Sequence, residues 1–108
     1  MKCLASVLLH SLKIVQPYVD NRSNNEAMRC VLVSWGPGEA TLRAERNSIS
    51  IKRVVKTLDD DDSGEVLLPP DRLTKILSTL ENKEVEIEDG NRADLHCDGK
   101  KFSFATME

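Results

Sequence analysis

The sequence predicts an α+β domain in which one unit is used twice, each time an amphipathic helix followed by three short strands. Apolar residues recur at steps of three and four over about Ala5–Val19 and again over Pro70–Leu80. Three β-rich segments bounded by turn residues follow each helix. The acidic run Asp59–Asp62 separates the two halves, about residues 1–58 and 63–108. A chain of 108 residues has room for one core, so we expect a single domain with both helices on one side of an antiparallel sheet.

The first helix is expected to have one apolar and one polar face. The apolar stripe contains Leu4, Leu8, Leu12, Val15 and Val19. Ser6, His10 and Lys13 fall on the opposite face. Pro17 lacks an amide hydrogen and disfavours helix in the residue before it, so we expect the last turn to end near Gln16.

The strands of the first half are expected around Met28–Trp35, Glu39–Ala44 and Ser48–Lys56. The sequence Gly36-Pro37-Gly38 supplies the turn between the first two strands, because glycine tolerates positive φ and proline fixes its own. In the third strand Ile49, Ile51 and Val55 occupy alternate positions, which predicts one buried face.

The acidic run in the middle of the chain is expected to be a solvated loop, because its like charges repel one another. Asp59, Asp61, Ser63 and Gly64 have the spacing of the first half of a calcium loop. The twelfth position of that loop requires a glutamate, and Pro70 stands there instead. A metal site is therefore not expected.

The second half repeats the pattern with clearer signals. Proline and aspartate at Pro70 and Asp71 favour the first turn of a helix. Its apolar stripe contains Leu73, Ile76, Leu77 and Leu80, and its outward positions include Arg72, Lys75 and Thr79. The following strands are expected at Glu84–Glu88, Arg92–Cys97 and Lys101–Thr106.

Composition and charge limit the classes of function. The net charge is −3, so any contact with nucleic acid must come from a local basic face. Three cysteines without CxxC spacing favour a reduced cytosolic compartment over a disulfide or zinc framework. The apolar N-terminal stretch is short and is interrupted by His10 and Lys13, which favours a packed helix over a signal peptide. No segment approaches the ~20 apolar residues of a membrane span, so no membrane partner is expected.

An enzymatic function is disfavoured by the residues that could carry chemistry. His96 and Cys97 are neighbours on a predicted strand, so their side chains point to opposite faces and cannot act as a base and nucleophile pair. The sequence has no glycine-rich phosphate loop and no zinc-ligand spacing. We therefore expect a non-catalytic protein without a cofactor.

The order and spacing of several segments resemble the N-terminal domain of the bacterial DNA polymerase III beta subunit, the sliding clamp. The resemblance spans almost the entire chain. The segments that carry it are Leu8–Leu12, the loop around Arg22, the strand Thr41–Ile51, Val66–Leu73 and Asp98–Phe104.

The resemblance implies a DNA-clamp fold, a βαβββ unit repeated twice, and places a short first strand within Met1–Leu4. It also implies a processivity factor, whose helices line a ring around duplex DNA and which tethers the polymerase without catalysing a reaction. A complete subunit of the family has three such domains and dimerises into a six-domain ring. In that family the groove for the polymerase and the clamp loader lies in the later domains, so these partners are expected only through domains absent from this chain.

The resemblance also suggests which residues approach DNA. It places Arg22 where the family has an arginine that contacts DNA, and it turns the outward helix faces with His10, Lys13, Arg72 and Lys75 toward the bore. The alternative for each is an ordinary solvated surface residue. Asp71 departs from the pattern, because a basic residue is expected beside the bore.

The last strand is a candidate contact with another subunit. Phe102 and Phe104 alternate around Ser103 and share one face, which core packing would also explain. This strand resembles the one that the family uses in its subunit contact, and Arg72 matches another interface position of the family.

A second function remains open from the sequence: a clamp-like adaptor or regulator that acts through an exposed edge strand without encircling DNA. A module that encloses DNA must gather its basic residues on one face, whereas an adaptor need not. The sequence leaves one basic stretch unplaced, formed by Arg43, Arg46, Lys52, Arg53 and Lys56.

Overall fold

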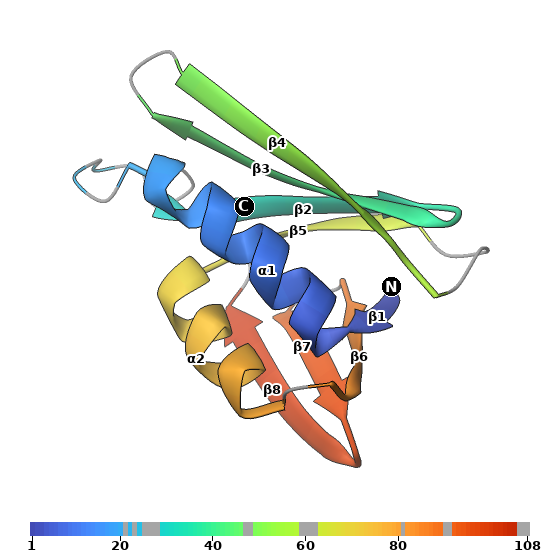
Figure 1. The fold of residues 1–108 in the computed structure, drawn as a ribbon. Coiled ribbons are helices and arrows are strands. Elements are labelled where there is room, and N and C mark those ends of the chain that lie inside the picture. The colour runs from blue at the N-terminus through green and yellow to red at the C-terminus, as the bar shows by residue number, and fades with distance from the viewer. Residues whose placement is uncertain are drawn as a thin grey trace.

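Two four-stranded antiparallel sheets and two helices make up the computed structural model of the chain (Figure 1). The structure describes residues 1–20, 22, 24, 29–46, 49–58, 63–80, 82–89 and 92–105. The elements in chain order are β1 (Lys2–Leu4), α1 (Ala5–Val15), the 3₁₀ turn η1 (Gln16–Tyr18), β2 (Val31–Gly36), β3 (Glu39–Arg46), β4 (Ile49–Lys56), β5 (Gly64–Leu68), α2 (Pro70–Leu80), β6 (Glu84–Glu88), β7 (Arg92–Cys97) and β8 (Lys100–Ala105). This order is a βαβββ unit used twice, which confirms the α+β class and the internal duplication predicted from the sequence.

Each half of the chain gives its first strand to the sheet of the other half. The strand orders are β4-β3-β2-β5 and β1-β6-β7-β8, so β1 pairs with β6 and β5 pairs with β2. Cys3 faces Val85 in the first of these pairs, and Val33 faces Val66 in the second. Met1 extends the contact, because its amino group donates to the Ile87 carbonyl at 2.9 Å. The exchange joins the two halves through backbone hydrogen bonds as well as through side chains.

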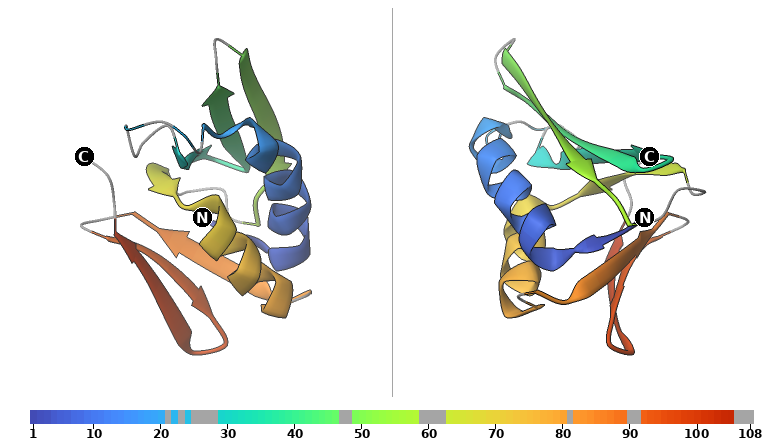
Figure 2. Two further views of the ribbon diagram at one scale, coloured as in Figure 1. Left: turned by 90° about the vertical axis from the view of Figure 1, so that its left-hand side faces the viewer. Right: turned by 45° about the vertical axis from the view of Figure 1, so that its right-hand side comes forward.

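The helices lie side by side on one side of the molecule, and the sheets spread away from them on the other side (Figure 2). Helix α1 contacts α2 and also packs on β3 and β4. It ends at Val15 and passes into the 3₁₀ turn that contains Pro17, which confirms the predicted helix end near Gln16. Helix α2 has the predicted limits.

The core is one cluster between the helices and the inward faces of both sheets. Its fully buried large side chains include Leu8, Leu12, Leu42, Leu73, Leu77, Ile87, Leu95 and Phe104. The predicted apolar stripe of the first helix is wrong at Leu4, which is 39% exposed. The expectation of a buried face on β4 is wrong at its start, because Ile49 is 60% exposed while Val55 is buried.

The strand limits differ from prediction mainly in the first half. Strand β2 begins at Val31, and the expected start at Met28 lies outside the described residues. Strand β8 begins at Lys100, one residue before the expected start. The acidic run Asp59–Asp62 lies outside the described residues. Within the described residues, no group of three side chains is suited to binding a metal ion. No helix in the described part is long and apolar enough to cross a membrane.

Candidate nucleic-acid interface and edge strands

The outer face of α1 carries two of the predicted DNA-binding residues. Leu8, Leu12 and Val15 are buried against the core, and this orientation leaves His10 and Lys13 exposed. Lys13 lies in the last turn, where a cation also interacts favourably with the helix dipole. Its position is therefore consistent with a DNA contact and with a purely local role.

The outer face of α2 contains two further predicted DNA-binding residues, Arg72 and Lys75. Leu73 and Leu77 are buried, and Arg72 and Lys75 are exposed. The two helices lie side by side (Figure 1). His10 lines a pocket with residues 53–56 of β4, whereas Arg72 lies over the Phe104 ring of β8, so these two residues flank the helix pair. A small group of cations on two adjacent helices is suited to weak contacts with phosphates, which carry no sequence information.

Asp71, the acidic residue that departs from the expected pattern, takes part in a contact between the helices. The Gln16 side-chain amide donates to Asp71 Oδ1, and Thr74 Oγ1 donates to Gln16 Oε1 at 3.1 Å. Asp71 also lies in the first turn of α2, where the helix dipole favours a negative charge. These contacts explain the presence of an acidic residue at position 71, and the sequence alone did not predict them.

Arg22 follows the 3₁₀ turn at the end of α1. Its side chain is exposed, and its backbone N–H donates to Asp20 Oδ1 at 3.2 Å. This local bond holds the backbone of a turn while the guanidinium stays in solvent. Arg22 is therefore available to a phosphate at the end of α1, and the DNA contact stays a prediction.

The two phenylalanines of β8 have different environments. Phe104 is 1% exposed and belongs to the core, whereas Phe102 is half-buried and packs against the edge of that core. The Arg72 guanidinium lies over the Phe104 ring, 5.2 Å from its centroid. Core packing thus accounts for Phe104, while the interface role predicted for Phe102, Phe104 and Arg72 stays a prediction.

Each sheet ends in strands whose outer backbone edge is a potential pairing surface. β8 is at one edge of the second sheet and β4 at one edge of the first. On β4, Val54 is 50% exposed and Ile49 is 60% exposed, on opposite faces of the strand. Sequence reasoning missed this second edge, because the alternation of polar and apolar residues does not reveal which strand lies at the edge of a sheet.

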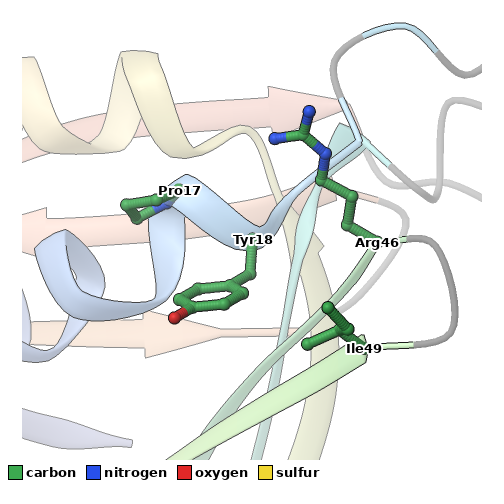
Figure 3. Close-up of a pocket in the computed structure, with 4 residues that line it drawn as sticks. All are labelled: Pro17, Tyr18, Arg46 and Ile49. Atoms are coloured by element: carbon green, nitrogen blue, oxygen red, sulfur yellow. The ribbon is translucent and has the colours of Figure 1, made fainter.

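An apolar pocket lies where the end of α1 meets the tips of β3 and β4 (Figure 3). Pro17, Tyr18, Arg46 and Ile49 line a cavity of 260 Å³. Figure 3 shows the Tyr18 ring below the 3₁₀ turn, with Ile49 of β4 to its right and Arg46 at the end of β3. The sequence did not predict this pocket, because its lining comes from two segments that are separated along the chain.

The basic stretch that the sequence left unplaced divides between the two faces of the first sheet. Arg53 is opposite the buried Leu42 and shares its inward face, toward α1. Arg43 and Lys52 are opposite each other on the other face, and both are exposed. The stretch therefore does not form one continuous basic surface.

The residues considered for catalysis are separated as expected. Cys97 is buried, whereas the His96 side chain is 37% exposed with Nε2 3.7 Å from the Glu88 carboxylate. Side chains on opposite faces of β7 cannot form a base and nucleophile pair.

The fold is similar to three solved beta subunits of bacterial DNA polymerase III. The subunit from Pseudomonas aeruginosa has a TM-score of 0.90 and 18% identity, with 100% of this chain and 30% of that chain covered. The sliding clamp from Bartonella birtlesii has a TM-score of 0.89 and 17% identity, covering 99% and 29%. The Helicobacter pylori beta clamp has a TM-score of 0.89 and 15% identity, covering 100% and 30%. The present chain thus spans about 30% of the length of these proteins.

A search of curated protein sequences finds no match. The family described as DNA polymerase III beta subunit, N-terminal domain, does match, and it matches residues 1–108. Because this match covers the whole sequence, the chain belongs to the DNA polymerase III beta subunit family and corresponds to its N-terminal domain.

Proposed function

We propose that this chain is a non-catalytic domain of a cytoplasmic DNA sliding clamp, which helps to encircle duplex DNA and to tether the replicative polymerase. The observation that carries the proposal is the match of residues 1–108 to the N-terminal domain of the beta subunit family. Its partners are duplex DNA and other clamp domains. The polymerase and the clamp loader would be bound through domains outside this chain.

The charges on the helix surface support a sliding contact. Lys13, Arg72 and Lys75 are exposed on adjacent helices, and Arg22 follows the end of α1. Affinity for duplex DNA rises steeply with the number of phosphates neutralised, so a small number of cations permits contact without arresting movement. The net charge of −3 further limits non-specific binding elsewhere on the molecule.

The edge strands support assembly into a closed ring. A ring requires two different surfaces on each unit, joined head to tail through a rotation that closes. Two such different edges are β8, where Arg72 lies over the Phe104 ring, and β4, where Val54 is exposed. Backbone pairing between the β8 edge of one domain and the β4 edge of the next would continue the sheets around the ring.

The test combines solution mass with DNA topology. Light scattering over a concentration series shows whether a species near six protomers forms. At concentrations where it does, the protein is bound to a nicked circular plasmid and washed at high salt, and the plasmid is then linearised. We expect retention on the circle and release on linearisation, because topological holding does not depend on salt whereas phosphate contacts do.

Two results would contradict this proposal for the isolated chain. The first is equal retention on circular and linear DNA. The second is a monomer or dimer at every concentration, which would favour an adaptor that binds another clamp subunit through its edge strand.

A further inference from the structure

The face of the first sheet that points away from α1 contains a shallow polar pocket. Its volume is 270 Å³, and it is lined by Leu32, Ser34, Thr41, Arg43, Lys52 and Glu65. Ala40, Leu42 and Ala44 on β3 are buried on the side of α1, so the alternating residues Thr41 and Arg43 belong to the opposite face. The pocket is therefore separate from the helix surface proposed to approach DNA.

Two cations are placed directly opposite each other in this pocket. Arg43 on β3 is the register partner of Lys52 on β4. Like charges in this position repel each other, and neither side chain has a hydrogen-bond or ion-pair partner among the described residues. Farther along the same two strands, Glu39 faces Lys56, which is the favourable arrangement. The sheet thus tolerates an unfavourable pair at one position only a few residues from a favourable one.

The neighbouring hydroxyl groups differ in availability. Ser34 Oγ donates to Glu65 Oε2 at 3.1 Å, so its proton is already used. Thr41 is two residues from Arg43 on the same face, and its hydroxyl has no hydrogen-bond partner among the described residues. The strand order places Lys52, Arg43 and Thr41 on the β3 and β4 side of the pocket and Glu65 on β5 at the far side.

We propose that Arg43, Lys52 and Thr41 form a binding site for a phosphate monoester or free phosphate. A guanidinium donates two parallel hydrogen bonds to such a group, an ammonium adds a second charge, and a hydroxyl adds a further donor. Two cations match the charge of a phosphate dianion, and its binding would relieve their mutual repulsion. Glu65 restricts the anion to the β3 and β4 side of the pocket.

The direct test is a titration of the folded chain with inorganic phosphate at constant ionic strength, followed by ¹H–¹⁵N NMR. We expect saturable shifts centred on the amides of Thr41, Arg43 and Lys52, with a dissociation constant of about 1–10 mM for a site exposed to water. Lys52→Gln should weaken binding about tenfold, the loss expected for one charge-assisted hydrogen bond.

Lys56→Gln is the matched control, because it removes the same charge from the same face of the same strand. It should change the affinity for phosphate less than twofold. Equal weakening by the two substitutions, or shifts spread over all basic residues without saturation, would overturn the proposal.

Thermal unfolding supplies a second, independent readout. In chloride buffer Lys52→Gln should raise the unfolding midpoint, because it removes a like-charge repulsion, whereas Lys56→Gln should not. Phosphate should raise the midpoint of the wild-type chain and of Lys56→Gln by more than that of Lys52→Gln. A lower midpoint for Lys52→Gln in chloride would contradict the repulsion on which the site is argued.

A phosphoserine peptide and its unphosphorylated form distinguish the two sources of the ligand. Binding of the phosphopeptide at least tenfold tighter than inorganic phosphate would identify a modified partner, and equal binding would identify the phosphate group alone. Equal binding of the phosphorylated and unphosphorylated peptides would overturn the site.

Discussion

At the scale of single residues, Arg22 offers the sharpest test of DNA contact. Its guanidinium is exposed while its backbone is held by Asp20, so Arg22→Ala removes a charge and leaves the backbone bond to Asp20 in place. If Arg22 neutralises one phosphate, the substitution should reduce the slope of log K against log salt by about 0.9. The measurement is fluorescence anisotropy of labelled duplex DNA over a salt series. Lys100→Ala in the β7–β8 hairpin is the control and should leave the slope unchanged; an unchanged slope for Arg22→Ala would exclude the contact.

Thr74 tests whether the polar contact between the helices contributes to stability. Its hydroxyl donates to Gln16 Oε1, across from α2 to the end of α1. Thr74→Val keeps the shape and removes this bond, and should lower the free energy of unfolding by about 1 kcal/mol. Thr79→Val on the same helix removes only an exposed bond to the Ile76 carbonyl and should have a smaller effect. Urea unfolding of both variants measures the two losses in the free energy of unfolding. Equal losses would contradict a stabilising role for the contact between the helices.

At the scale of elements, the close approach of β5 to β2 depends on a glycine. A Cβ at Gly64 would lie 2.5 Å from Trp35 Cζ2 and 2.7 Å from Asp89 Oδ2, so Gly64→Ala must displace the ring or the strand. We expect a loss of about 1–3 kcal/mol in the free energy of unfolding, as for other overpacked sites. Gly36→Ala is the control, because a Cβ added at Gly36 would have nothing within 4 Å. Equal chemical denaturation curves for the two variants would show that the strand accommodates the added Cβ without a loss in the free energy of unfolding.

The edge strand β8 gives a prediction about association. Phe102 is half-buried at the margin of the core, whereas Phe104 is fully inside it. If β8 is a subunit contact, Phe102→Ala should weaken self-association or binding to another clamp domain at least tenfold, an effect typical of an interface anchor. Analytical ultracentrifugation measures self-association, and calorimetry measures binding to another clamp domain. A fully folded Phe102→Ala variant with unchanged association would remove β8 from the interface.

The elements that sequence reasoning placed correctly have strong local signals. The limits of α2, β6 and β7 agree with prediction, because Pro70 marks the helix start and the strand Glu84–Glu88 alternates strictly. The exposure of Ile49 and the pairing of Arg43 with Lys52 could not be predicted in this way. Both depend on the position of β4 at a sheet edge and on the register of β3 with β4, which are set by contacts distant in sequence.

The same distinction applies to the candidate site. The outward direction of Lys13 and Lys75 follows from helix periodicity, and the structure agrees with it. The contact of Arg72 with Phe104 joins α2 to β8 across about thirty residues of sequence, and only the folded structure reveals it. Periodicity predicts which way a side chain points, but not which partner it meets.

At the scale of the whole molecule, the exchange of first strands predicts that neither half folds alone. A fragment of residues 1–58 would lack β5 beside β2, and a fragment of residues 63–108 would lack β1 beside β6. Each fragment would also expose the helix surface that α1 and α2 bury against each other. Small single sheets without a covered apolar face are marginal at best, so both fragments should be largely unfolded by circular dichroism.

Mixing the two fragments should restore the helix and sheet signals and a cooperative thermal transition, because each supplies the strand and the helix that the other lacks. The transition midpoint should rise with fragment concentration, as expected when folding and association are linked. A single fragment that unfolds cooperatively by itself would show that the halves are autonomous. In that case the strand exchange would be an addition to two stable units, and the chain could not be described as one domain with one core.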